Sequence, residues 1–237
     1  MGRWDDGGGP LRAPAWAVAP FGEEVGSDAL APHPVTVGCV SLVYRLMYLV
    51  GFTPWDTGKV PAQVIELVDG DEARPAGRAL DIGCGTGTTS VYLAAKGWEV
   101  TGIDAIEKPL RQARARATAA GVTVQWIRAD VTRLPQLGLT PGYTLLFDRG
   151  CFHGLNPQQQ AAYASGVGQI AQPGATLLMM AFVRNNVPVG PAGVDEEEIV
   201  RAFAGWELAS ATTDSGPAPP GPLGKVPRRW YRLVRRA

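Results

Sequence analysis

A glycine-rich turn between an apolar strand and a helix constrains the fold of this chain more than any other feature. Residues 78–82 have the apolar pattern of a buried strand, and Gly83, Gly85 and Gly87 follow at once, before a helix expected over 86–96. Glycine lets a tight turn adopt left-handed backbone conformations and lets a ligand approach the backbone closely. The segment therefore predicts an α/β unit with a ligand site at the turn.

Strands and helices alternate along the chain after this turn. Further strands are expected at residues 98–104, 122–127, 143–147, 175–182, 206–211 and 230–234, and further helices at 106–120, 157–172 and 195–203. Asn156 is expected to cap the helix that begins at Pro157. Strands that alternate with helices form a parallel sheet with helices on both faces, so we expect an α/β, doubly wound, Rossmann-like fold.

The composition of the chain divides it into three parts. Residues 1–36 are rich in Gly, Pro and Ala, which disfavours regular structure, and we expect an N-terminal arm that is mobile or wraps the surface. Residues 37–76 are expected to form a helical cap. Residues 77–237 contain the alternating elements and form the core, so that cap and core make one domain, 37–237.

Two apolar segments of the cap are expected to be helices. Residues 40–50 suit a short, mostly buried helix, and residues 62–68 suit another. A membrane-surface anchor at 40–50 is the less favoured alternative, because Arg45 alone makes a poor basic face. The longest apolar run, 40–52, is shorter than the ~20 residues that span a bilayer, so no membrane span is expected.

Composition and charge disfavour several classes of function. The 22 Lys and Arg residues balance 22 Asp and Glu residues, so no global field favours nucleic acid or an anionic membrane. Three widely spaced cysteines and two histidines suggest neither a disulfide framework nor a metal site. The N-terminus has no signal-peptide pattern. We therefore expect a cytoplasmic protein, monomer or homodimer, with no bound metal and no nucleic-acid partner.

Acidic residues before the glycines and after the next two strands indicate which ligand the turn holds. A dinucleotide is disfavoured, because Thr88 stands where its fingerprint has a third glycine and Asp81 would repel a pyrophosphate. Asp104 is placed to accept hydrogen bonds from a ribose diol. Asp130 offers an acceptor to an exocyclic amine, and Val131 offers an apolar neighbour to a flat base. These features predict S-adenosylmethionine (SAM) as the cofactor.

The D-x-G-x-G-x-G pattern that begins at Asp81, with acids after the next two strands, resembles the class I SAM-dependent methyltransferases over residues 60–237. The resemblance implies a seven-stranded, mostly parallel sheet whose last strand, 230–234, is antiparallel. It implies that the glycine backbone lies along the methionine part of SAM, that Asp104 holds the ribose hydroxyls and that Asp130 meets the adenine amine. Asp81 would support the loop and the amino group of the ligand. The cofactor-binding residues expected on this basis are Trp55, Asp81, Gly83, Cys84, Gly85, Gly87, Asp104, Ala105, Asp130, Val131 and Asp148.

Two further elements are similar to the thiopurine and thiol methyltransferase branch of this family. They are a Trp-x-x-Gly element at 55–58, before the core, and an Asp-Arg-Gly element at 148–150, after the fourth strand of the core. An indole at Trp55 that faces the sulfonium would supply a π face to the cation and exclude water, so Trp55 is expected in a lid. The alternative is an aromatic side chain that only packs.

The catalytic residues expected are Asp148, Arg149 and His153. By the resemblance, Arg149 faces the acceptor and steers an anionic or thiolate-bearing substrate. Asp148 ends a strand at the sheet edge where such folds bind ligands, or it is a structural acid paired with Arg149. His153 is a base, an orienting group, or a surface or capping histidine. Cys84 and Cys151 are interpreted as small apolar fillers, since direct transfer from SAM needs no cysteine nucleophile.

This chemistry predicts methyl transfer from SAM to a small-molecule nucleophile by direct in-line displacement. A thiol acceptor comes first, because a pKa of about 8.5 makes the thiolate accessible and Arg149 would lower that pKa further. Methylation of oxygen or nitrogen in a phenolic or heteroaromatic acceptor is the alternative, and a phenol, with a pKa of about 10, would need a base such as His153 or Asp148. A SAM-binding module without catalysis is a lower alternative.

Two other enzyme classes are disfavoured. A transferase that uses decarboxylated SAM would need extra acids for a polyamine, where this chain has Arg149. A nucleic-acid methyltransferase is disfavoured because residues 148–151, Asp-Arg-Gly-Cys, replace the Asn/Asp-Pro-Pro-aromatic element expected of many such enzymes. The dense basic residues between 228 and 236 are interpreted as a solvated face of the last strand.

Overall fold

The computed structural model describes residues 47, 53, 56, 58–71, 73–187, 191–219 and 221–237. The expected arm, residues 1–36, lies outside these residues, and so does the expected lid residue Trp55. Of the helix expected at 40–50, only Met47 is described, and it is helical. The boundaries of the arm and of the cap stay predictions.

A seven-stranded sheet forms the centre of the described chain, in the order β3-β2-β1-β4-β5-β7-β6. The strands are β1 (Arg78–Ile82), β2 (Glu99–Asp104), β3 (Gln125–Arg128), β4 (Tyr143–Arg149), β5 (Ala171–Phe182), β6 (Trp206–Thr213) and β7 (Arg228–Arg235). Strands β1 to β5 pair in parallel, whereas β7 is antiparallel to both of its neighbours, β5 and β6. The expected fold class, with its antiparallel last strand, is confirmed.

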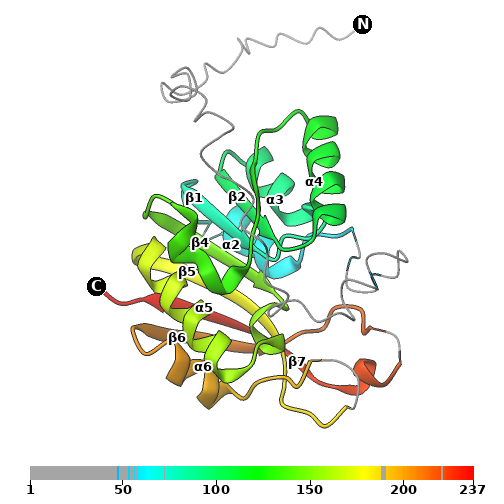
Figure 1. Ribbon diagram of the computed structural model, residues 1–237, viewed down its shortest axis with the longest axis vertical. Coiled ribbons are helices and arrows are strands. Elements are labelled where there is room, and N and C mark those ends of the chain that lie inside the picture. Colours follow the sequence, from blue (N-terminus) through cyan, green and yellow to red (C-terminus); the bar gives the residue numbers. More distant parts are fainter. Residues whose placement is uncertain are drawn as a thin grey trace, which may run out of the picture. The chain divides into compact units, whose positions relative to one another are not determined.

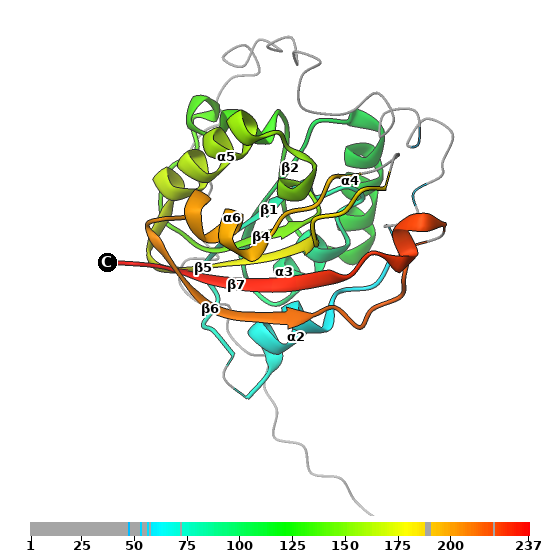
Figure 2. The same ribbon diagram turned by 90° about the horizontal axis from the view of Figure 1, so that it is seen from below.

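Helices cover both faces of this sheet (Figure 1). The α-helices are α2 (Ala62–Asp69), α3 (Thr88–Ala95), α4 (Glu107–Ala120), α5 (Pro157–Ile170) and α6 (Glu196–Ala202), and the 3-10 helices are η2 (Val131–Leu137), η3 (Phe152–Gly154) and η4 (Pro222–Lys225). Figure 2 shows α5 and α6 on one side of β5 and β7, and α2 on the other side. Within the described residues, no helix has the length and apolarity needed to cross a membrane.

Each face of the sheet has its own apolar core, because successive strand residues point to opposite faces. On one face, Tyr163 of α5 and Phe203 after α6 are fully buried and their rings meet edge to face, 6.3 Å apart. On the other face, Val64 of α2 and Leu93 of α3 are buried in a second cluster with Trp230 of β7. The sheet therefore separates two cores that are both closed by helices.

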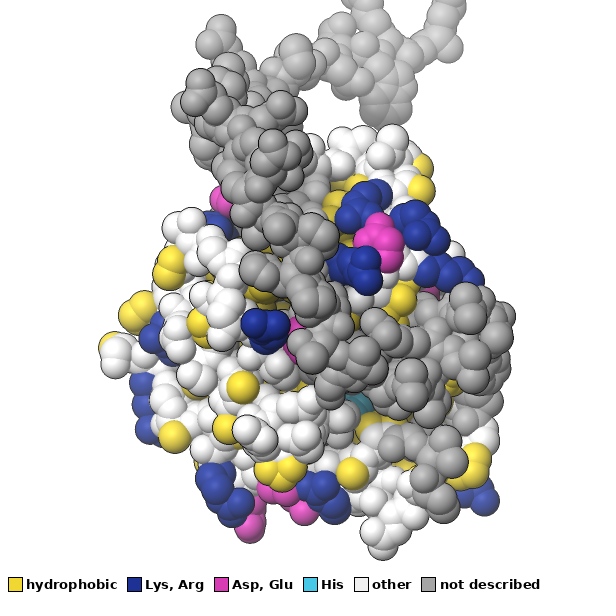
Figure 3. Space-filling view, in the orientation of Figure 1, with side chains coloured by type: hydrophobic (Ala, Val, Ile, Leu, Met, Phe, Trp, Pro, Cys, Tyr) yellow, Lys and Arg dark blue, Asp and Glu magenta, His cyan; other side chains and the backbone are white. Residues whose placement is uncertain are grey.

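Helix α4 shows how amphipathic patterning places a helix on the sheet. Leu110, Ala113 and Ala117 recur at helical spacing and are buried. The outward face carries charged side chains, and Figure 3 shows Lys and Arg around an acidic side chain over this helix. An ion pair of 2.8 Å joins Arg114 to Glu107 on this outer face. The helix ends at Gly121, whose φ of +66° suits glycine.

Most of the expected elements are present, with shifted ends. The capping box at the start of α5 is confirmed, because Asn156 and Gln159 each accept a hydrogen bond from the backbone of the other. Helix α3 begins at Thr88 and not at 86, since Gly87 has a φ of +75° that no helix contains. Strand β5 begins four residues earlier than the expected 175, at Ala171, and its register against β4 shifts between Ala171 and Thr176.

The two glycines of α5 are expected to respond in opposite ways to alanine. A Cβ on Gly166 would lie 3.0 Å from Leu134 Cβ and 3.1 Å from Pro135 Cδ in η2, whereas nothing lies within 4 Å of a Cβ on Gly168. Gly168→Ala is expected to raise the free energy of unfolding by up to about 1 kcal/mol through helix propensity. Gly166→Ala is expected to lower it, because overpacking costs about 1–3 kcal/mol. Urea unfolding measures both, and equal stabilities would contradict the tight contact between α5 and η2.

Candidate active site

The glycine turn joins β1 to α3 and is held by the end of β2. The backbone N–H groups of Gly83 and Cys84 donate to the carbonyl of Ile103 at 2.8 and 2.9 Å. Gly83, Gly85 and Gly87 have φ values of +73°, +54° and +75°. A Cβ on Gly83 would lie 2.2 Å from the Sγ atom of Cys151, so no larger residue fits there. The turn thus has the close-packed, left-handed backbone that its sequence predicted.

Asp104 lies at the end of β2 and contacts the glycine turn directly. Its Oδ2 atom accepts from the N–H of Gly85 at 3.0 Å, and its Oδ1 atom accepts from the N–H of Ile106 at 2.8 Å. The side chain is buried, and burial raises its pKa to about 6 against the opposing effect of these hydrogen bonds. The structure therefore brings the expected ribose-binding acid to the expected turn.

Asp81 is a second buried acid at the same edge of the sheet. The hydroxyl of Ser90 in α3 donates to its Oδ2 atom at 2.6 Å. Burial raises the pKa of Asp81 to about 7, and the neighbouring carboxylates of Asp104 and Asp148 add to the increase. Acids that are costly to ionise in this way attract a cationic ligand, because its charge offsets their repulsion.

The other described residues of the expected cofactor site follow β1, β2 and β3. Asp130 caps η2, where its Oδ1 atom accepts from the N–H and the hydroxyl of Thr132 at 2.9 and 2.7 Å. Ala105 and Val131 are buried. Cys84 is also buried, and burial raises the pKa of its thiol well above the usual value, which agrees with its interpretation as an apolar filler.

Asp56, Thr86 and Arg116 form a network that the sequence analysis missed. The Thr86 hydroxyl donates to Asp56 Oδ2 at 2.7 Å, and Arg116 of α4 donates to the Thr86 carbonyl at 3.1 Å. The segment before the core therefore contacts the glycine turn at Asp56. The sequence held two signals for this network. Asp56 is an acid next to the expected lid residue, and Thr86 lies between two of the glycines in the turn.

The catalytic role expected for Asp148 needs correction. Its carboxylate is fully buried and accepts from the N–H groups of Gly150, Cys151 and Phe152 at 2.8, 2.7 and 3.0 Å. The Tyr163 hydroxyl donates to it as well, at 2.7 Å. Burial raises the pKa of Asp148, and these hydrogen bonds oppose that increase. Within the described residues the carboxylate forms no ion pair with Arg149 at 4 Å or less, and the turn after β4 folds around it.

The role of His153 as a base, and its alternative as a surface histidine, also need correction. The ring is 3% exposed, and its Nδ1 atom accepts from the backbone N–H of Phe182 at 3.2 Å. Burial lowers its pKa to about 4, so the ring is neutral at pH 7. A neutral ring that accepts at Nδ1 carries its proton on Nε2 and has no lone pair left for a substrate. His153 instead ties the turn after β4 to the end of β5.

Arg149 follows Asp148 and is half-buried at the same edge of the sheet. Burial lowers its pKa, Asp214 and Asp56 oppose that effect, and Arg228 adds to it. Within the described part of the chain, no acid forms an ion pair with Arg149 at 4 Å or less. Arg149 is thus a partly desolvated cation whose charge is only partly compensated.

The acid with the largest electrostatic effect on Arg149 is Asp214, and its carboxylate already has two other partners. Asp214 forms an ion pair of 3.0 Å with Arg228 and accepts from the indole N–H of Trp230 at 3.0 Å. Both members of the ion pair have side chains only 12% exposed. Arg228 was expected on a solvated face of the last strand. Its burial in this ion pair shows that the expectation was wrong for Arg228. The pair lies near Arg149 and limits how far Asp214 neutralises that cation.

Comparisons with known proteins agree with this geometry. A family model described as a methyltransferase domain matches residues 79–174. The 2-heptyl-1-hydroxyquinolin-4(1H)-one methyltransferase of Mycobacteroides abscessus is 27% identical over 150 residues, which cover 62% of this chain and 64% of that protein. Thiocyanate methyltransferase 1 of Arabidopsis thaliana is 29% identical over 187 residues, which cover 76% of this chain and 80% of that protein. The matched part is thus just under two thirds of the length of the first relative.

The fold is shared with a solved methyltransferase structure. The crystal structure of the 1,6-didemethyltoxoflavin-N1-methyltransferase of Burkholderia thailandensis, with bound 1,6-didemethyltoxoflavin and S-adenosylhomocysteine, has a TM-score of 0.64 at 18% identity, covering 82% of this chain and 86% of that one. At this identity the likeness shows the fold. The matched methyltransferase domain, together with the thiocyanate methyltransferase relative and a probable thiol methyltransferase of Arabidopsis thaliana that is 28% identical over 173 residues (68% of this chain and 71% of that protein), supports a class I SAM-dependent methyltransferase related to the thiol methyltransferases.

Proposed function

We propose that this SAM-dependent small-molecule methyltransferase methylates the sulfur of a small thiol, taken as its thiolate. The observation that carries the proposal is the chemistry at the end of β4, where Arg149 supplies a cation while both expected bases are engaged in the fold. A site with a cation and no such base suits an acceptor that ionises readily by itself. A thiol, with a pKa of about 8.5, is such an acceptor.

The donor set at the glycine turn fits SAM. Three glycines with positive φ present backbone to a ligand, and the buried acids Asp81 and Asp104 suit a ligand that carries positive charge. We propose that Asp104 holds the ribose hydroxyls, that Asp130 meets the adenine amine and that Asp81 supports the loop and the ligand's amino group. Trp55, outside the described residues, stays the proposed lid aromatic. A cytoplasmic location and a monomeric or homodimeric state likewise stay predictions.

In this reaction the chain has three tasks: it binds SAM and the acceptor, orients them toward each other and excludes water. SAM supplies an electrophilic sulfonium methyl group, which passes to the acceptor sulfur as the bond to the sulfonium breaks. The Arg149 guanidinium would lower the pKa of a bound thiol and hold the thiolate by charge. Asp148 is a positioning residue, because it fixes the turn that carries Arg149. His153 is another, since it attaches that turn to β5.

Methylation of an acidic oxygen is the second candidate function. One relative is named for a 1-hydroxyquinolinone, a heteroaromatic acceptor. An acceptor of this kind that is anionic at neutral pH would meet the same cation, Arg149, and would need no base. A simple phenol, with a pKa of about 10, is disfavoured for the opposite reason. SAM binding without turnover on any acceptor would support the third alternative, a binding module without catalysis.

Arg149→Met is expected to raise the KM for a thiolate acceptor about tenfold or more, because a charge-assisted contact is lost. Arg149→Lys is expected to recover part of that loss, since it keeps the charge. Turnover of a panel of thiols, phenols and heteroaromatic amines measures the effect, with Arg111→Met on the outer face of α4 as the control. Unchanged kinetics on every accepted substrate in Arg149→Met would remove the support for an anionic acceptor.

Asp104→Asn is expected to weaken SAM binding about tenfold or more, because a carboxylate acceptor is replaced by a weaker amide. Glu99→Gln, at the exposed start of the same strand, is the matched control and is expected to bind as the wild type does. Isothermal titration with SAM measures both variants. Equal affinity in all three proteins would contradict the proposed ribose contact, even if turnover persisted.

SAM affinity is expected to rise between pH 5.5 and 8, because Asp104 and Asp81 lose their protons with pKa values of about 6 and 7. Their folded pKa values lie above the ordinary 3.8, so their protonation stabilises the ligand-free fold fully below pH 3.8, and that contribution is lost as pH rises from there to the folded pKa values of about 6 and 7. Binding then releases protons near pH 6.5, which titration in buffers of different ionisation enthalpy detects. Asp81→Asn is expected to flatten the upper part of the profile; a flat wild-type profile would refute the assignment.

A further inference from the structure

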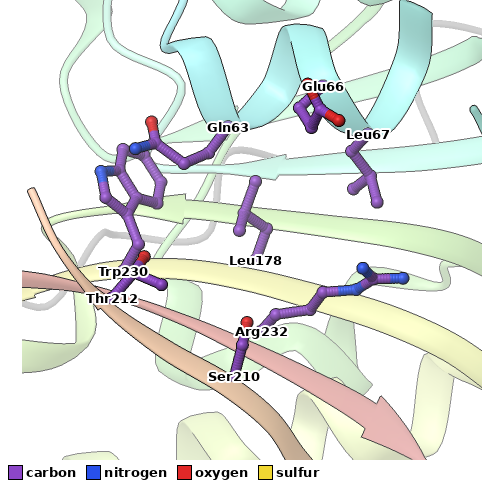
Figure 4. A pocket seen from close by; sticks show the side chains of 8 residues that line it. All are labelled: Gln63, Glu66, Leu67, Leu178, Ser210, Thr212, Trp230 and Arg232. Carbon is purple, nitrogen blue, oxygen red and sulfur yellow. The ribbon is translucent and has the colours of Figure 1, made fainter. Parts of the chain in front are cut away.

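A cavity of about 210 Å³ lies between α2 and the strands β5, β7 and β6 (Figure 4). Its floor is made of two rows of paired residues that cross the strands. Arg232 of β7 stands between Leu178 of β5 and Ser210 of β6, and Trp230 stands next to Thr212 in the neighbouring row. These rows lie within the strands, whereas the candidate active site is at the carboxyl ends of β1, β2 and β4. The cavity is therefore a separate feature of the fold.

Arg232 is incompletely satisfied in this cavity. Its Nε atom is buried and, among the described residues, has no hydrogen-bond partner. A buried donor of this kind is costly, and the cost is greatest for a charged group. In Figure 4 the guanidinium reaches along the cavity toward the side where Glu66 and Leu67 of α2 line it. Because this atom is not exposed to the cavity, an acceptor placed there would bind the other nitrogens of the guanidinium, which reach along it.

The charge around Arg232 favours an anion. Arg74 lies close enough for its pKa to be lowered by burial and then by Arg232, so two cations share this region. Glu66 is exposed, and within the described chain it forms no ion pair with Arg232 at 4 Å or less. Arg232 lines the cavity, and Arg74, which lines a neighbouring pocket, adds a second positive charge near this end against one solvated carboxylate.

The other end of the cavity is a rigid aromatic wall. The Trp230 ring stacks on Phe147, with centroids 6.1 Å apart, and its N–H is bonded to Asp214. Figure 4 shows Trp230 and Gln63 at the end away from the Arg232 guanidinium, with Leu178 between the two ends. A cavity of about 150 Å³ holds a benzene ring, so this volume accommodates a ring and a short acidic arm.

We propose that this cavity is a second ligand site, which binds a small aromatic carboxylate with its acid group on Arg232 and its ring against Trp230 and Leu178. The carboxylate supplies the counter-charge that Arg232 lacks, since within the described residues no acid forms an ion pair with it at 4 Å or less, and a planar guanidinium matches carboxylate geometry. The ring covers apolar surface that α2 leaves open. The hydroxyls of Ser210 and Thr212 at the exposed rim remain available to polar substituents.

The test uses 4-fluorophenylacetate as probe and follows its fluorine NMR signal with the full-length protein. Binding at millimolar concentration is expected to persist when S-adenosylhomocysteine saturates the cofactor site. The uncharged 4-fluorophenylacetamide is expected to bind about tenfold more weakly, and Arg232→Met is expected to weaken the acid about tenfold. Arg236→Met, an exposed arginine after the same strand, is the matched control and is expected to change nothing.

Other outcomes overturn the proposal. Loss of binding in Arg149→Met, with Arg232→Met unaffected, would place the probe in the candidate active site. Equal binding of the acid and the amide would remove the role of charge, and no binding in the wild type would remove the site. Ser210→Leu narrows the cavity at an exposed position, so it locates the probe even if Arg232→Met does not fold; unchanged affinity in Ser210→Leu would count against the cavity.

Discussion

The burial of one carboxylate, that of Asp148, organises the edge of the sheet where the candidate active site lies. It accepts three successive backbone N–H groups after β4 and the hydroxyl of Tyr163 from α5. A buried carboxyl group without such partners would cost several kcal/mol, so the turn folds around it. This turn after β4 places Arg149 at the sheet edge. It also places the Cys151 sulfur against the glycine turn and His153 against the end of β5. Acceptor side and cofactor side thus depend on the same group.

Three buried acids share this edge, and their partners differ. Asp148 is compensated by four hydrogen bonds, three of them from backbone amides. Asp104 has two backbone donors, and Asp81 has the hydroxyl of Ser90. The pKa values follow this order for the last two, at about 6 for Asp104 and about 7 for Asp81. Under the proposed function, a cationic cofactor would complete the compensation that the protein alone leaves unfinished, which would link fold stability, pH and ligand binding at one place.

The sequence was sufficient to predict the position of a residue when that position is set by the strand or turn that carries the residue. Asp104 could be assigned because parallel strands end at one edge, which brings its carboxylate to Gly85. Asp148 was misinterpreted because spacing shows which edge a side chain reaches but not its distant partner, and Tyr163 comes 15 residues later from another element. Arg232 was assigned to a solvated face for a similar reason. Only the packing of α2 against the sheet reveals that its Nε atom is buried.

Under the proposed function, the selectivity of the enzyme would follow from which acids remain available to Arg149. Asp214 would neutralise this cation if it were not engaged by Arg228 and Trp230. Because it is engaged, the net field at the end of β4 favours an anionic acceptor, whether the charge sits on sulfur or on an acidic oxygen. In this proposal charge would select the ionisation state of the acceptor, and it would not by itself distinguish sulfur from oxygen.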